Sequence, residues 1–190
     1  LSMEELVNTE AFLIIDADTL LLTPRVFKKA NTIWMDYSHE RNLLYLKGYR
    51  ELLGRRASYF ISFVCHHMFG EKRILKALKE RIGEHTGKRW DEAIIDLADS
   101  PVWSDREKST FPFNYFSEYE TYGNFSQEFY HDVRSRYFRN HAAKEYSPSE
   151  MTPEEYVAGL PSFFQWASFH SYYEYKDLGP DEGSEQPEKP

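Results

Sequence analysis

The chain has 190 residues, of which 41% are apolar and 28% charged, so it is long enough and apolar enough for one folded domain with a sizeable core. Its formal net charge of −8 and its lack of a basic stripe exclude general nucleic-acid binding. Its single cysteine, Cys65, excludes an intrachain disulfide and a cysteine-cluster zinc site, and it favours a reducing, cytoplasmic location.

The first predicted element is a short strand over residues 12–15 (Phe-Leu-Ile-Ile), an unbroken apolar run typical of a strand buried on both faces in a parallel sheet. The whole run is far shorter than the roughly 20 residues of a membrane helix, so no membrane span is expected. Asp16 and Asp18 follow it directly. Two carboxylates at the end of a buried strand can bind Mg²⁺ or Mn²⁺, which would bridge to phosphate oxygens.

Two classes of enzyme place an Asp-X-Asp after an apolar strand. In metal-dependent sugar-nucleotide transferases the pair holds the metal against the donor's diphosphate. In haloacid-dehalogenase-type phosphatases the first aspartate, Asp16 here, is a covalent nucleophile. The phosphatase would also need a second acidic pair, for which Asp96 and Asp99 are candidates, although helical spacing there predicts a solvated face. A solvated turn after the strand is a third interpretation of Asp16 and Asp18.

The next apolar run, residues 59–65, predicts a strand that ends at His66 and His67. Imidazoles at a strand end can bind a metal, a phosphate or a hydroxyl. Adjacent strand residues face opposite sides, so at most one of the two histidines is expected to point into a given site. The alternative is that one histidine packs inside the protein and the other lies on its surface. Apolar residues at helical spacing then predict helices over 70–84 and 90–97.

Residues 111–130 are rich in Phe and Tyr and predict loop and short strand rather than a long helix. Glu118 and Glu120 lie among these aromatic residues. Rings that desolvate a carboxylate raise its pKa, which makes a glutamate a usable base near neutral pH. The alternative is that both glutamates are exposed in a loop.

The last part of the chain predicts one further helix and a tail. Thr152, followed by Pro153 and two glutamates, predicts the start of a helix. Residues 179–190 hold mostly Pro, Gly and acidic residues, which predicts a disordered acidic tail after a domain over 1–178.

Three motifs occur in a defined order: residues 12–20 (Phe-Leu-Ile-Ile-Asp-Ala-Asp-Thr-Leu), residues 63–69 (Phe-Val-Cys-His-His-Met-Phe) and residues 116–125 (Phe-Ser-Glu-Tyr-Glu-Thr-Tyr-Gly-Asn-Phe). Together they resemble a family of largely uncharacterised bacterial proteins assigned to the GT-A type of sugar-nucleotide glycosyltransferase, over about residues 11–130. The resemblance implies an α/β fold with a GT-A-like mixed sheet flanked by helices. It also implies transfer of a sugar, as by a hexosyltransferase, from a nucleotide-diphosphate donor to a glycan or other hydroxyl acceptor.

The resemblance assigns roles to individual side chains. The implied ligands of Mn²⁺ or Mg²⁺ are Asp16, Asp18 and His170. The implied base, or partner of the acceptor hydroxyl, is Glu118, with Glu120 as second choice. The residues implied to bind donor or acceptor are His66, His67, Ser117 and Tyr119.

Two features depart from the family pattern. Cys65 stands where the family has serine, and only fifteen residues precede Asp16, where a complete GT-A domain has several nucleotide-binding strands. We therefore expect the chain to be the carboxyl-terminal portion of a longer protein, or to lack the base-binding half and be inactive alone. An exposed sheet edge would then favour homo-oligomers. A further hypothesis is a non-enzymatic, glycan-binding remnant that uses its aromatic residues.

Overall fold

The computed structural model describes residues 1–169 except 41, 58–60, 105–114 and 144–145. The described residues form small mixed sheets flanked by helices, which confirms the α/β class. The strands are β1 (Ala11–Ile15), β2 (Thr19–Leu21), β3 (Lys28–Lys29), β4 (Thr32–Tyr37), β5 (His67–Glu71), β6 (Val133–Tyr137), β7 (Asn140–Ala142) and β8 (Trp166–Ser168). The helices are α1 (Met3–Leu6), α2 (Leu43–Leu53), α3 (Lys72–Thr86), α4 (Trp90–Leu97), α6 (Glu118–Phe129) and α7 (Pro153–Ala158).

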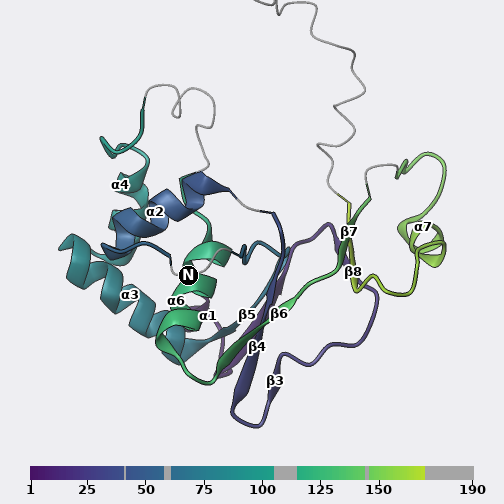
Figure 1. Cartoon of the computed structure of the whole chain (residues 1–190), viewed down its shortest axis with the longest axis horizontal. Coiled ribbons are helices and arrows are strands. Elements are labelled where there is room, and N and C mark those ends of the chain that lie inside the picture. The colour runs from purple at the N-terminus through teal and green to yellow at the C-terminus, as the bar shows by residue number, and fades with distance from the viewer. Residues whose placement is uncertain (41, 58–60, 105–114, 144–145, 170–190) are drawn as a thin grey trace, which may run out of the picture.

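The strands make three small sheets beside a group of helices. β1 pairs antiparallel with β5; β4 lies between β3 and β6 and runs parallel to β6; β8 lies between β2 and β7. Helices α2, α3, α4 and α6 gather on one side of the molecule, and β7, β8 and α7 lie at the other (Figure 1). None of the helices within the described ranges is long and apolar enough to cross a bilayer.

The predicted strand at residues 12–15 is confirmed as β1, but its predicted parallel pairing and burial on both faces are wrong. β1 is antiparallel to β5, and Leu13 and Ile15 are 39% and 42% exposed. Phe12 is buried and fits against Gly70, where a Cβ atom would lie 2.4 Å from the Phe12 ring. Alternate residues of β1 therefore face the core and the outside, and the run is apolar on both faces although only one face is covered.

The predicted strand over 59–65 is also wrong where the structure describes it, because residues 61–65 hold only an isolated bridge at Ser62 and the strand β5 begins at His67. Residues 58–60 lie outside the described residues. His66 has a φ of +59°, in the left-handed region that non-glycine residues seldom adopt. With this left-handed conformation at His66, the side chains of His66 and His67 lie in different surroundings.

The predicted loop and short strand over 111–130 is wrong where the structure describes it, because residues 118–129 form the helix α6. Its N-cap is Ser117, whose hydroxyl accepts a hydrogen bond from the Glu120 amide at 3.2 Å. Gly123 allows close packing, since a Cβ atom there would lie 2.2 Å from the Phe63 ring. Burial against such neighbours stabilises a helix whose aromatic residues have only modest helix propensity.

The other predicted helices are confirmed. α3 covers residues 72–86 and α4 covers residues 90–97. α7 begins at the predicted cap, where the Thr152 and Glu155 side chains each bond the other residue's backbone. The predicted acidic tail lies outside the described residues.

Two hydrophobic clusters hold these elements together. The larger one joins the group of helices to β4, β5 and β6 through fully buried residues such as Ile33, Leu75, Tyr122 and Val133. The smaller one consists of Cys65, Phe138 and Trp166, with Phe27 packed against it. The segment that carries His66 and His67 lies between elements of both clusters.

Candidate functional site

The turn after β1 presents the side chain of Asp16. The Asp16 amide donates to the His66 carbonyl at 2.9 Å, and the Asp16 carbonyl accepts from the Thr19 amide at 3.1 Å. The Asp16 carboxylate accepts a hydrogen bond from the Tyr119 hydroxyl at Oδ1 and lies 3.3 Å from His66 Nδ1 at Oδ2. It remains 35% exposed. The structure thus brings together one residue from each of the three sequence motifs.

His66 joins two carboxylates. Its Nδ1 faces Asp16, and its Nε2 lies 3.3 Å from Glu40 Oε2. Burial alone would lower the pKa of His66, but the hydrogen bonds and charges of Asp16 and Glu40 outweigh it and raise the pKa to about 9. The imidazole is therefore cationic at neutral pH. Its left-handed backbone is held by strand β5 on one side and by the Asp16 amide on the other.

Tyr119 comes from the first turn of α6, and its ring is buried while its hydroxyl reaches Asp16. Burial, together with the neighbouring Asp16 carboxylate, raises the pKa of Tyr119. The phenol therefore keeps its proton and donates a hydrogen bond to the carboxylate. This bond fixes the direction of Asp16 from the helix side, as His66 does from the strand side.

Asp18, the second predicted metal ligand, is partly exposed in the same turn. Its carbonyl accepts from the Phe169 amide at 2.8 Å, next to the pairing of Thr19 with Ser168. The third predicted ligand, His170, lies outside the described residues.

The carboxylates of this turn can be compared with the ligands that a divalent cation requires. Within the described ranges, no group of three or more His, Cys, Asp or Glu side chains converges as a metal site. Mg²⁺, however, is usually bound through one or two carboxylates together with waters and substrate phosphates. Asp16 and Asp18 offer such carboxylates, and each carboxylate has roughly four lone-pair positions, so a hydrogen-bonded Asp16 can still bind a cation. No described residue completes a group of three such ligands around Asp16 and Asp18, so metal binding there stays a prediction.

His67 does not face Asp16. Its Nδ1 lies 2.8 Å from the Cys65 carbonyl, and its Nε2 lies 2.8 Å from Asp36 Oδ2. Its ring stacks on Trp166 with centroids 4.1 Å apart. The prediction that one histidine of the pair packs away from the site is confirmed, and the packing one is His67.

Asp36 is the centre of a buried ionic cluster that sequence reasoning missed. Arg25 binds it through two hydrogen bonds of 2.7 Å, and Arg136 Nε adds a third of 2.6 Å. Burial alone would raise the pKa of Asp36, but the hydrogen bonds from His67 and the two arginines lower it to about 2. The side chain of Asp36 is 1% exposed, so this cluster serves the fold rather than a ligand.

The two candidate base residues differ in access. Glu120 is fully buried and accepts hydrogen bonds from Ser62 Oγ at 2.5 Å and from Asn124 Nδ2 at 3.0 Å. In this structure its carboxylate has no contact with solvent, and it links α6 to the segment before His66. Glu118, at the first position of α6, is partly exposed and precedes Tyr119. Of the two, Glu118 is the one that solvent reaches.

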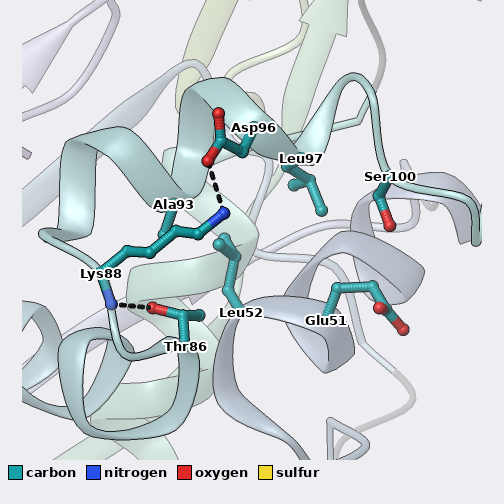
Figure 2. Close-up of a pocket in the computed structure, with 8 residues that line it drawn as sticks. All are labelled: Glu51, Leu52, Thr86, Lys88, Ala93, Asp96, Leu97 and Ser100. Carbon is teal, nitrogen blue, oxygen red and sulfur yellow. Dashed lines mark hydrogen bonds and ion pairs between the residues drawn. The ribbon is translucent and has the colours of Figure 1, made fainter.

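Asp96, which the phosphatase hypothesis would use, lies on α4 and is bound to Lys88 at 2.7 Å. Figure 2 shows this ion pair at a pocket of about 150 Å³ between residues of α2, α3 and α4. Both side chains are more than half exposed. The solvated-face interpretation of Asp96 is confirmed.

Glu40 is a site residue that the sequence interpretation overlooked. It lines a second pocket, of about 180 Å³, beside His66. The signal was present, because polar residues 38–40 (Ser-His-Glu) follow directly on the alternating run that forms β4. The pocket is lined by Ser38, His39, Glu40, Val64, His66, Tyr137, Phe138 and Asn140.

Comparison of the chain with protein-family models, with curated proteins and with solved structures gave no significant match.

Proposed function

We propose that the protein is a metal-dependent glycosyltransferase of the GT-A type, which moves a sugar from a nucleotide-diphosphate donor to an acceptor hydroxyl. The observation that supports this proposal is the meeting of Asp16, His66 and Tyr119 at one partly exposed carboxylate. These residues come from three distant segments, and each belongs to one motif of the resemblance.

Asp16 and Asp18 would hold Mn²⁺ or Mg²⁺ against the donor's diphosphate. When bound, the metal supplies Lewis-acid chemistry that neutralises charge on the leaving diphosphate. Tyr119 and His66 orient the Asp16 carboxylate from two sides, so that it needs little reorganisation when a ligand binds. His66 also provides a positive charge beside the place where the diphosphate would lie.

Glu118 is the proposed partner of the acceptor. In an inverting reaction its carboxylate would take the proton of the attacking acceptor hydroxyl. In a retaining reaction it would orient that hydroxyl instead. Its position at the start of α6, one residue before Tyr119, places it on the element that reaches Asp16.

The proposal is tested by the effect of Mn²⁺ plus a nucleoside diphosphate on the melting temperature. Ligands that bind only the folded state stabilise it by about 2.7 kcal/mol at a concentration 100 times Kd. In a chain of this size that is a shift of roughly 5–10 °C. Asp18→Ala is expected to abolish the shift. Asp96→Ala, which removes an exposed aspartate paired with Lys88, is the matched control and keeps it.

Three results would contradict the proposal. One is the lack of any metal-dependent shift in the unchanged protein, and another is an undiminished shift in Asp18→Ala. A third is release of phosphate from an aryl phosphate with a covalent adduct on Asp16, which would support the phosphatase hypothesis instead. Glycan binding that needs neither metal nor nucleotide, without any turnover of a sugar nucleotide, would support the non-enzymatic remnant.

A further inference from the structure

The pocket beside His66 has the size for one small polar ring. Its volume of about 180 Å³ is below the roughly 300–1,000 Å³ of sites that enclose drug-sized ligands. Three segments form it: the residues after β4, the segment before β5, and the corner between β6 and β7. Because two of these segments are anchored in paired strands, the pocket is largely formed before any ligand binds.

An aromatic group forms one wall of the pocket. Tyr137, at the end of β6, is 44% exposed. The ring of His39 lies 5.0 Å from it and the ring of Tyr37 lies 5.7 Å from it, centroid to centroid. These neighbours hold the Tyr137 ring in place while leaving part of it open. A rigid ring with a polar tip suits the apolar C–H face of a sugar.

Polar groups on the pocket wall complement the aromatic ring. The side chain of Glu40 is 58% exposed and can accept hydrogen bonds from hydroxyl groups. The amide oxygen of Asn140 accepts from the Ser168 hydroxyl at 3.1 Å, so its NH₂ group is the donor that a ligand hydroxyl would meet. One accepting carboxylate, one donating amide and one ring face together match the surface of a hexopyranose.

His66 connects this pocket to the site at Asp16. Its Nδ1 faces Asp16 and its Nε2 faces Glu40, so one imidazole ring forms a wall shared by the two sites. We propose that the pocket of Glu40, Tyr137 and Asn140 binds the hexopyranose ring that takes part in the transfer at Asp16. This inference rests on the proposed function for the reaction, but not for the binding of the sugar. The ring belongs either to the acceptor or to the donor's own sugar, and both would be recognised by the same chemistry.

The test is saturation-transfer NMR on the full chain in two arms. The first arm uses methyl α-D-glucopyranoside and methyl β-D-galactopyranoside without metal or nucleotide, and a signal there identifies an acceptor subsite. The second arm uses UDP-glucose with Mn²⁺, and a sugar signal confined to it identifies the donor's sugar. In whichever arm gives the signal, Tyr137→Ala is expected to weaken it at least tenfold. Tyr137→Phe keeps the ring and is expected to keep the signal.

Control variants test whether a loss of the sugar signal is specific to the pocket. Phe163→Ala removes an aromatic ring that is 53% exposed elsewhere, and it is expected to leave the signal unchanged. Asn140→Ala tests the polar wall independently, should Tyr137→Ala fail to fold. In the first arm, Asp16→Asn is expected to keep the glycoside signal while the metal-dependent melting shift is lost.

The outcomes distinguish this inference from the proposed function. A sugar signal that Tyr137→Ala and Asn140→Ala both leave intact overturns the pocket assignment, as does the lack of a sugar signal in both arms. Neither result changes the shift in melting temperature that Mn²⁺ and a nucleoside diphosphate are expected to cause. Loss of that shift in the unchanged protein, with a glycoside signal that depends on Tyr137, overturns the transferase and leaves a sugar-binding pocket.

Discussion

The neighbouring residues His66 and His67 contact two different carboxylates. The Asp16 cluster around His66 and the Asp36 cluster around His67 differ in exposure and in partners. His66 lies between Asp16 and Glu40, whose side chains are 35% and 58% exposed. His67 binds Asp36, whose side chain is 1% exposed. The partners of Asp36 are two arginines, whereas Asp16 is held by a tyrosine and a histidine.

The difference shows that adjacent residues of one short segment can contact a buried and a partly exposed carboxylate. The left-handed backbone at His66 and the start of β5 at His67 turn the two rings to different surroundings. The Asp36 carboxylate is buried and is bonded by Arg25, Arg136 and His67, so it has no room left for a ligand. The Asp16 carboxylate remains partly exposed, so solvent reaches it.

The largest expected effect comes from breaking the sealed cluster. Asp36→Asn removes the charge that faces Arg25 and Arg136, and buried charges without a counter-charge are costly. We expect the free energy of unfolding to fall by about 3–5 kcal/mol, as measured by urea denaturation. Asp96→Asn, which breaks the exposed pair with Lys88, is expected to change it by less than about 0.5 kcal/mol. Equal effects of the two variants would contradict the distinction between sealed and exposed pairs.

The pH dependence of stability gives a second test of the contribution of Asp36. The pKa of Asp36 is lowered from 3.8 to about 2 in the folded protein, so the unfolded chain binds more protons between these values. The contribution of Asp36 is therefore fully present above pH 3.8 and is lost as the pH falls through about 2. This corresponds to about 2 kcal/mol. Denaturation between pH 5 and 2 measures it, and Asp36→Asn is expected to show a shallower decline than the unchanged protein.

Local patterns in the sequence predicted the helices that have apolar residues at helical spacing or a cap motif of their own. α3 and α4 follow from apolar residues at helical spacing, and the cap at Thr152 is a property of four consecutive residues. α6 was missed, because its aromatic residues and Gly123 favour other structures locally. What makes this segment helical is tertiary packing, such as the close fit of Gly123 against Phe63.

The candidate site divides in the same way. Asp16, His66 and Tyr119 were each named from a sequence motif, and the structure brings them into contact, while the roles that the resemblance assigns to them stay predictions. Glu40 lies in a polar stretch after β4 that the sequence shows, but its contact with His66 emerges only from the structure. The sequence predicted that the two histidines face opposite sides, but only the structure shows that His66 is the one that faces Asp16.

The smallest expected effect compares the two histidines directly. His67→Gln removes a buried ring that stacks on Trp166 and binds Asp36, whereas His66→Gln removes a ring between two partly exposed carboxylates. We expect His67→Gln to lower the free energy of unfolding by about 1–2 kcal/mol more than His66→Gln, because it leaves a buried group unsatisfied. For ligand binding the order is expected to reverse: His66→Gln weakens the Mn²⁺-dependent melting shift, and His67→Gln preserves it. If both variants lost stability and ligand binding in the same proportion, the two clusters would form one unit, and the division between a sealed and an open carboxylate would be wrong.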